Sequence, residues 1–226
     1  MSDPYLPLRL EMVENQIARR ALLSPRLLEA FRKVPRHCFI PAECQKNAYD
    51  DGPLPIGLQQ TISQPYIVAL MTNLLQLEGD ENVLEVGTGS GYQAAILAEL
   101  ARTVQTLERH PALADHAATI LAKLGYTNIF SHAGDGSLGW PATAPYHGIL
   151  VTAAAPTPPP PLLDQLADGG KLVIPVGDHL GQELQVWERH GSRFEPESII
   201  PVTFVPLRGA HGWSDLEWNE SAGFIF

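Results

Sequence analysis

Apolar residues recur at helical spacing through the first part of the chain. They lie three or four residues apart, as on one face of an amphipathic helix, at Leu10, Val13, Ile17 and Ala21. A second helix is expected from Leu27 to Val34, since Ser24 can cap its first turn and Pro35 ends it. From 37 to 64 proline and glycine interrupt every pattern. We expect that stretch to be an ordered connection or a flap over a site.

After Pro65, predicted helices and strands alternate. The helices are expected at 67–74, 92–100, 112–124 and 162–166. The strands are expected at 82–86, 103–107, 129–133, 149–153 and 172–176. Repeated β-α-β units predict an α/β fold with a doubly wound, mostly parallel, Rossmann-like sheet covered by helices on both faces. A closing antiparallel pair is expected at the C-terminal edge, at 183–189 and 199–207.

These patterns divide the chain into three parts. Residues 1–64 form an N-terminal helical segment with the flap, and residues 65–208 form the Rossmann-like core. Residues 209–226 form a tail that carries Trp213, Trp218, Phe224 and Phe226 but has no clear period. The role of the tail is left open.

Composition and charge exclude several classes of protein. The 226 residues are 45% hydrophobic and 18% charged, which describes one compact globular chain rather than a disordered one. The net charge is −10 and no basic cluster exceeds two residues, so we expect no nucleic-acid partner. No apolar stretch approaches the roughly 20 residues that cross a bilayer, and the start lacks a signal pattern. We therefore expect no membrane association and a cytoplasmic location.

Cysteine and histidine do not point to a metal. The two cysteines, Cys38 and Cys44, are too few for a disulfide framework and lack a zinc-binding spacing. The eight histidines are scattered along the chain. The sequence therefore predicts no metal site.

A glycine-rich loop directly follows the strand expected at 82–86. It reads Gly87-Thr88-Gly89-Ser90-Gly91 and leads into a helix. Such glycines let the backbone turn sharply near a ligand, and the free N–H groups at the helix start favour a negative group. A nucleotide-like cofactor is therefore expected. The dinucleotide fingerprint needs its third glycine at position 92, where this chain has Tyr92, which argues against a nicotinamide cofactor.

Three acidic residues stand near the ends of consecutive predicted strands. Glu85 lies two residues before the first glycine, Glu108 ends the next strand, and Asp135 lies between Gly134 and Gly136 after the third. The carboxyl ends of parallel strands share one rim of a sheet, so these acids are expected near the glycine loop. At Glu108 a carboxylate can accept hydrogen bonds from both ribose hydroxyls.

Together these motifs resemble the protein-L-isoaspartate (D-aspartate) O-methyltransferase family, within the class I S-adenosylmethionine-dependent methyltransferases. The resemblance runs from about Met12 to Leu207. The glycine loop identifies the cofactor class, and Thr61-Ile62-Ser63 with Pro65 points to this family specifically. The other matching stretches are 34–36, 54–57, 134–136, 152–155, 166–177 and 204–207.

The resemblance implies the reaction. S-adenosyl-L-methionine would donate a methyl group to the α-carboxyl of L-isoaspartyl residues, or the β-carboxyl of D-aspartyl residues, in damaged proteins and peptides. The ester would then close to a succinimide and begin repair. The isoaspartyl α-carboxyl has a pKa of about 3.5, so it is already ionised and no general base is needed. Orientation of the reacting atoms can contribute as much as roughly 7 to 11 kcal/mol. The resemblance also implies partners that contain isoaspartyl residues, and we expect a monomer.

The resemblance further implies roles for particular residues. The loop Gly87, Thr88, Gly89, Ser90 and Gly91 would admit the methionine part of the cofactor, with Glu85 nearby. Glu108 would bind the ribose hydroxyls, and Asp135 with Gly136 the adenine amino group. The substrate side would be lined by Thr61, Ile62 and Ser63. Ser63 would position the substrate carboxylate, although a serine before Pro65 also suits a helix cap.

One departure and three alternatives stand beside this interpretation. Where the family usually has Asp before the fourth strand, this chain has His147, which predicts a less stable edge rather than loss of methyl transfer. A related O-methyltransferase could be dedicated to one aspartate of a precursor peptide, with the aromatic tail as its docking surface. A nicotinamide-dependent oxidoreductase is disfavoured by the glycine spacing. A non-catalytic adenosine-ligand sensor would have no use for the stretch from Thr61 to Ser63.

Overall fold

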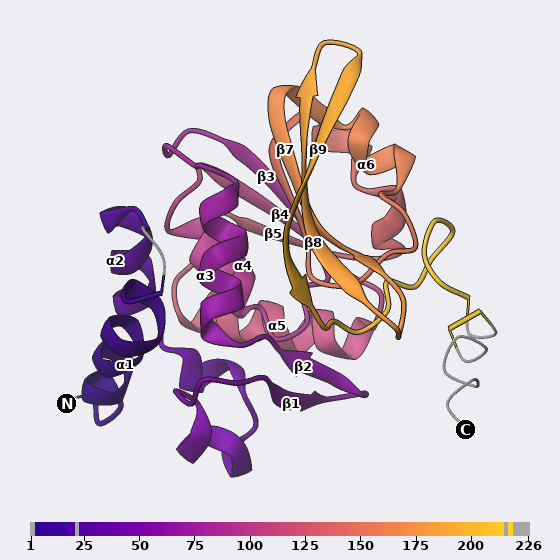
Figure 1. Cartoon of the computed structure of the whole chain (residues 1–226). Helices are drawn as coiled ribbons and strands as arrows, with labels where there is room; N and C mark the ends of the chain where they lie inside the picture. Colours follow the sequence, from indigo (N-terminus) through magenta and orange to yellow (C-terminus); the bar gives the residue numbers. More distant parts are fainter. Residues whose placement is uncertain (1–2, 21–22, 215–216, 219–226) are drawn as a thin grey trace.

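The computed structural model describes residues 3–20, 23–214 and 217–218 (Figure 1). Its helices are α1 (Leu6–Met12), α2 (Pro25–Lys33), α3 (Pro65–Leu74), α4 (Tyr92–Ala98), α5 (Pro111–Lys123) and α6 (Pro160–Asp164). Its strands are β1 (Leu54–Gly57), β2 (Gln60–Ile62), β3 (Asn82–Val86), β4 (Thr103–Glu108), β5 (Ile129–Ala133), β6 (Tyr146–Val151), β7 (Leu166–Gly177), β8 (Gln182–His190) and β9 (Arg193–Val202). Further helical segments are π-helical at Val13–Ala18 and 3-10 at Arg36–Phe39, Ala42–Asn47, Gly136–Leu138 and Pro141–Thr143.

The main sheet has the order β5-β4-β3-β6-β7-β8-β9. Its pairs from β5 to β7 are parallel, and the pairs β7/β8 and β8/β9 are antiparallel. The predicted doubly wound sheet with an antiparallel C-terminal edge is confirmed. Strand order reverses between β3 and β6, and in such sheets the loops after those strands form the ligand crevice.

Helices cover both faces of the sheet, and successive side chains of a strand pack against opposite faces. In β3, Val83 packs with Met71 of α3 and Leu97 of α4, whereas Leu84 packs on the opposite face with Leu162 of α6. All these side chains are at most 1% exposed. Successive side chains of a strand point to opposite faces, so an apolar run such as Val83-Leu84 requires cover on both sides.

The N-terminal segment packs against α4 rather than directly on the sheet. Phe31 and Phe39 make edge-to-face contacts with Tyr92, at ring-centroid distances of 6.1 and 5.5 Å. Such aromatic pairs add about 0.5–1.5 kcal/mol each beyond the burial of their surface. One apolar cluster thus joins residues from both sides of position 64, and the division at that position stays a prediction. Ala21 of the predicted first helix lies outside the described residues.

The connection from 37 to 64 contains a small antiparallel hairpin, β1–β2, that the sequence did not predict. Its strands are only 4 and 3 residues long, which is too short for an alternating pattern to stand out. At its tip Leu58 and Gln59 adopt φ angles of +49° and +59°. These left-handed conformations are uncommon for residues other than glycine.

The second strand of the predicted closing pair was placed too late in the sequence. A strand was expected at 199–207, but β9 runs from Arg193 to Val202 because the turn at Gly191 reverses the chain at once. His190 and Arg193 are paired across that turn. The following stretch instead lies against the end of β6, where Leu207 N donates to Ala154 O at 2.8 Å.

The residue that departs from the family pattern lies at the end of the sheet opposite these loops. His147 is exposed on β6, and its Nδ1 accepts a hydrogen bond from Asn82 N at 3.2 Å. A carboxylate at this position would accept the same bond with a negative charge, and such bonds are stronger. We expect His147→Asp to raise the melting temperature by about 1–2 °C in thermal denaturation. Cofactor affinity should stay within about twofold of wild type, and an unchanged melting temperature would contradict the expectation of a weakened edge.

Within the described ranges, the helices are all too short or too polar to cross a bilayer.

Candidate active site

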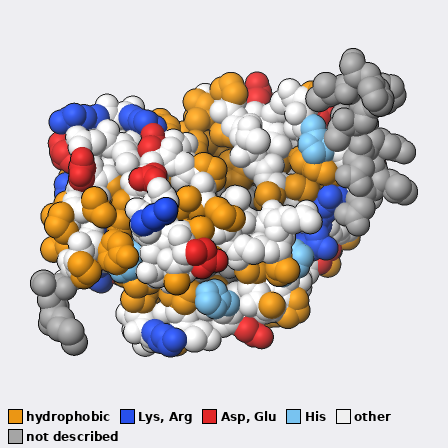
Figure 2. Space-filling model, turned by 90° about the horizontal axis from the view of Figure 1, so that it is seen from below, with side chains coloured by type: hydrophobic (Ala, Val, Ile, Leu, Met, Phe, Trp, Pro, Cys, Tyr) orange, Lys and Arg blue, Asp and Glu red, His pale blue; other side chains and the backbone are white. Residues whose placement is uncertain are grey.

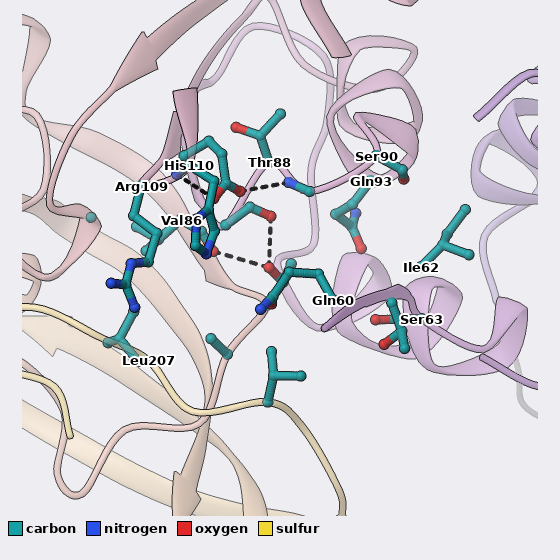
Figure 3. A pocket seen from close by; sticks show the side chains of 18 of the residues that line it. Gln60, Ile62, Ser63, Val86, Thr88, Ser90, Gln93, Arg109, His110 and Leu207 are labelled. Carbon is teal, nitrogen blue, oxygen red and sulfur yellow. Dashed lines mark hydrogen bonds between the residues drawn. The ribbon is translucent and has the colours of Figure 1, made fainter. Parts of the chain in front are cut away.

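A cavity of about 490 Å³ lies at the carboxyl ends of β3, β4 and β6. The β1–β2 hairpin borders it, as does the stretch from Val205 to Arg208 (Figure 3). Its volume falls in the range of small-molecule sites. On the face shown in Figure 2, apolar side chains are spread between a few charged ones. Nine of the predicted site residues line the cavity: Thr61, Ile62, Ser63, Gly87, Thr88, Gly89, Ser90, Glu108 and Gly136.

The glycine loop needs glycine for two different reasons. Gly87, Gly89 and Gly91 all have positive φ angles, +95°, +51° and +87°. At Gly87 space is also lacking, because a Cβ there would lie 2.2 Å from Thr152 Oγ1. That hydroxyl donates to Gly87 O at 2.7 Å and fixes the loop to the end of β6. Gly91 does not line the cavity and packs instead toward Ala117 of α5, 3.2 Å from the position of a Cβ.

Glu108 is held in a single orientation at the end of β4. Its Oε2 accepts a hydrogen bond from Gly89 N, and its Oε1 accepts one from His110 N, both at 2.9 Å. The residue is only 5% exposed and lines the cavity. Each carboxylate oxygen retains a further lone-pair site, so the carboxylate can accept two more donors from a ligand.

Glu85 lies beneath the loop and not in the cavity wall. It is fully buried, and its Oε2 accepts a hydrogen bond from Thr106 Oγ1. The Thr106 hydroxyl is in turn 2.6 Å from the Thr88 hydroxyl, which lines the cavity. Glu85 therefore supports Thr88 through Thr106. Burial raises the pKa of Glu85 to about 8, so its carboxyl is largely neutral at pH 7.

This raised pKa predicts how stability depends on pH. Between about pH 4.5 and 8 the folded chain keeps a proton on Glu85 that the unfolded chain has lost, so stability falls as pH rises through this window. Glu85→Gln removes the titration but keeps the shape. We expect the wild type to lose on the order of 2–4 kcal/mol more than Glu85→Gln between pH 5 and 8, in urea denaturation. Parallel losses in the two proteins would contradict this assignment.

Asp135 also lies outside the cavity wall, and its carboxylate faces the tail. Oδ2 accepts a hydrogen bond from Ala210 N at 2.7 Å, and Oδ1 accepts bonds from the backbone and hydroxyl of Ser137. Burial opposes ionisation of Asp135, but these hydrogen bonds outweigh it and lower the pKa of the carboxyl. Gly136, next to it, does line the cavity, and a Cβ there would lie 2.5 Å from Val86 Cγ1.

The loop that ends in Ser63 is anchored by a buried arginine. Arg36 is fully buried, and it donates from Nε to Ala48 O and from Nη2 to Ser63 O, both at 2.8 Å. Its guanidinium lies 5.0 Å from the centre of the Tyr92 ring. Burial lowers the pKa of Arg36 to about 10, which leaves it charged at neutral pH. The side chain thus fixes the backbone of Ser63, whose side chain faces the cavity.

Several cavity residues were missed by the sequence analysis. Figure 3 shows Arg109 and His110 across the cavity from Ser63 in that view. Their position directly after Glu108 could have indicated them, whereas Trp218 carried no such signal. The others include Leu58, Gln60, Gln93, Thr152 and Leu207. In the part of the chain that the structure describes, no three His, Cys, Asp or Glu side chains gather as a metal site.

Comparison with known proteins gives a consistent family. The family model "Protein-L-isoaspartate(D-aspartate) O-methyltransferase (PCMT)" matches residues 9–212. The chain is 55% identical over 202 residues to Protein-L-isoaspartate O-methyltransferase 1 of Syntrophobacter fumaroxidans, covering 89% of this chain and 94% of that protein. It is also 55% identical over 217 residues to Protein-L-isoaspartate O-methyltransferase of Methanoregula boonei, covering 95% and 100%.

A solved structure shares the fold at lower sequence identity. It is a Plasmodium falciparum protein assigned as a protein-L-isoaspartate O-methyltransferase, in complex with S-adenosyl-L-homocysteine. The TM-score is 0.76 at 24% identity, over 88% of this chain and 98% of that one. The motifs, the sheet order and the curated relatives agree, and the chain belongs to the protein-L-isoaspartate(D-aspartate) O-methyltransferase family.

Proposed function

We propose that this chain transfers a methyl group from S-adenosyl-L-methionine to the α-carboxyl of L-isoaspartyl residues, and to the β-carboxyl of D-aspartyl residues, in damaged proteins and peptides. The resulting ester would close to a succinimide and begin repair. The observation that carries the proposal is one cavity that holds both an oriented acceptor for a nucleoside, Glu108, and the Thr61–Ser63 stretch. Family membership supplies the substrate class.

The cofactor side of the cavity follows from the loops after β3 and β4. Glu108 would accept hydrogen bonds from the two ribose hydroxyls, because its carboxylate is already oriented by two backbone N–H groups. The backbone of Gly87 and Gly89 would lie against the methionine part, with Thr88 and Ser90 beside it. Glu85 and Gly91 do not line the cavity, and they would support the glycine loop without touching the cofactor.

The adenine would lie toward Gly136. We assign recognition of its amino group to Asp135, whose Oδ2 retains a lone-pair site beyond its bond to Ala210 N, whereas Oδ1 already accepts two bonds from Ser137. Because Asp135 also anchors the tail, its loss would affect both the cofactor and the tail.

Catalysis would rest on positioning. The bound cofactor supplies a sulfonium-activated methyl group. A substrate carboxylate oxygen would form the new bond to that carbon as the carbon–sulfur bond breaks, and the transfer would require no proton to move. The hydroxyl of Ser63 would donate to the carboxylate and hold it in line, with Thr61 and Ile62 beside it. Arg36, which binds Ser63 O at 2.8 Å, would keep that hydroxyl in place.

A serine substitution tests the substrate side. Ser63→Ala removes one donor to a charged acceptor, so kcat/KM for an isoaspartyl peptide should fall about 10- to 100-fold in a labelled-methyl assay. The affinity for S-adenosyl-L-homocysteine, measured by calorimetry, should not change. The matched control is Ser131→Ala, on the exposed side of β5, which should leave both quantities unchanged. Full activity of Ser63→Ala would remove Ser63 from the proposed role.

The function itself is tested with paired substrates. We expect methyl transfer from labelled S-adenosyl-L-methionine to a short isoaspartyl peptide and none to the same peptide with a normal aspartyl residue. Transfer to neither peptide, with cofactor binding intact, would favour a relative dedicated to a precursor peptide. Absence of cofactor binding would contradict the methyltransferase assignment altogether.

We further propose that the chain acts as a cytoplasmic monomer on protein substrates, without nucleic-acid or membrane partners. The free thiols of Cys38 and Cys44 are compatible with a reducing compartment. The net charge of −10 opposes binding to polyanions, and the Lys and Arg side chains visible in Figure 2 are separated rather than gathered. Light scattering of the purified chain should give the mass of one copy.

A further inference from the structure

The start of the tail is tied to the loop after β5. Ala210 N donates to Asp135 Oδ2 at 2.7 Å, and His211 N donates to Ser137 Oγ at 3.0 Å. Two more bonds bring the chain back on itself, since Trp213 N donates to Leu207 O at 2.8 Å and the Arg208 guanidinium donates to Trp213 O at 3.2 Å. These hydrogen bonds hold the start of the tail, from Ala210 to Trp213, against the core.

Reciprocal hydrogen bonds then join Ser214 and Glu217. Glu217 N donates to Ser214 Oγ at 3.2 Å, and Ser214 N donates to Glu217 Oε2 at 3.0 Å. This Ser-x-x-Glu arrangement is a capping box. Trp218 N follows with a bond to Ser214 O at 3.2 Å. The position of Trp218 is thus set by local hydrogen bonds that the sequence encodes.

The ring of Trp218 lies on the β7 side of the cavity. Its ring centroid is 3.7 Å from that of His179 in the loop between β7 and β8, and 5.6 Å from that of Trp213. His179 Nε2 is also 2.6 Å from Trp218 O. In the sheet, β6 separates β7 from β3 and β4, whose loops carry the proposed cofactor residues. Trp218, which lines the cavity, therefore belongs to the side left for the peptide.

The hairpin adds a second apolar side chain to the same cavity. Leu58 lies at the tip of β1–β2, lines the cavity and is 54% exposed. Its φ of +49° is a conformation that leucine rarely adopts, and such outliers concentrate at ligand sites. A large apolar residue is thus held in an unfavourable backbone conformation with its side chain open to solvent. Leu58 and Trp218 come from two different segments that line the same cavity.

We propose that Trp218 and Leu58 form a subsite for the side chain of a residue next to the isoaspartyl residue, and that the subsite favours a large apolar or aromatic side chain. An indole face and a leucine side chain bury a large apolar contact area against such a side chain. They bury little area against a small polar one. The proposal rests on the function proposed above. The subsite would give the enzyme a preference for the residue beside the isoaspartyl residue, whereas the methyl transfer itself requires only the isoaspartyl linkage.

The test uses the full-length chain and two isoaspartyl peptides that differ only at the neighbouring residue, Phe or Ser. The wild type should favour the Phe peptide in KM by about 10-fold, the discrimination typical of one apolar side chain in a pocket. Trp218→Ala should reduce that ratio to about twofold or less by raising KM for the Phe peptide, at little cost in kcat. Trp218→Phe should restore most of the KM ratio between the two peptides. Leu58→Ala should lower this ratio, but less than Trp218→Ala does.

Calorimetry with S-adenosyl-L-homocysteine supplies the control, and its affinity should be unchanged in all three variants. If Trp218→Ala raises KM equally for both peptides, or weakens cofactor binding while the ratio persists, the subsite is wrong. A wild type that methylates both peptides equally well also overturns the subsite but leaves the proposed function standing. A wild type that methylates neither peptide contradicts the proposed function itself.

Discussion

Glu108→Ala should weaken the binding of S-adenosyl-L-homocysteine by about 100-fold or more in calorimetry, because hydrogen bonds to a charged group contribute about 1.5–3 kcal/mol each. The variant loses both proposed ribose bonds. It also frees Gly89 N and His110 N, which Glu108 now orients at 2.9 Å.

Two comparisons separate this effect from a general loss of charge. Glu108→Gln keeps one acceptor oxygen but sets an amide donor against a backbone N–H, so its affinity should fall between those of Glu108→Ala and the wild type. Glu197→Ala, on the exposed side of β9, removes the same charge far from the cavity and should have no effect. Wild-type affinity in Glu108→Ala would show that the ribose lies elsewhere.

Arg36→Met should lower kcat for an isoaspartyl peptide by about 30- to 100-fold, because a displacement of about 1 Å at a positioned group can cost that much. Its effect on the free energy of unfolding is the difference between two opposing contributions. Removing a buried charge whose pKa is lowered from 12.5 to about 10 recovers about 3 kcal/mol, while the freed carbonyls of Ala48 and Ser63 cost about 1–3 kcal/mol each. The net change should therefore lie between a gain of about 1 kcal/mol and a loss of about 3 kcal/mol.

A second buried arginine gives the matched control. Arg9 is 6% exposed and donates from Nε to Arg32 O at 2.7 Å, but it does not touch the loop of Ser63. Arg9→Met should therefore destabilise the chain, by urea denaturation, and keep kcat within about twofold of wild type. Equal losses of kcat in Arg9→Met and Arg36→Met would mean that Arg36 acts on stability alone.

The strands of the sheet could be predicted because each buried strand is a short run of apolar residues in the sequence. β3 and β5 begin and end where the apolar runs at 82–86 and 129–133 predicted. The helices followed from apolar spacing, as in α5, where the predicted range 112–124 is one residue later than the observed Pro111–Lys123. The glycine loop and Glu108 were also predictable, since a backbone turn at a strand end needs particular residues in a fixed order.

The remaining features depend on contacts that are distant in sequence. Arg36 and Ser63 are 27 residues apart, and only the folded chain shows that one holds the other. Asp135 faces Ala210, 75 residues away, rather than the cavity. Trp218 belongs to a tail without a period, and its contact with His179 joins residues 39 positions apart. Such contacts leave no periodic pattern in the sequence.

The central claim is that this chain catalyses transfer by positioning a carboxylate that is already ionised. The most direct test is the pH dependence of kcat with a saturating isoaspartyl peptide between pH 5.5 and 7.5. The substrate carboxyl, with a pKa of about 3.5, is ionised throughout, so kcat should change by less than about twofold. A rate that rises about tenfold per pH unit would contradict the account, because it would require a protein group to lose a proton before transfer.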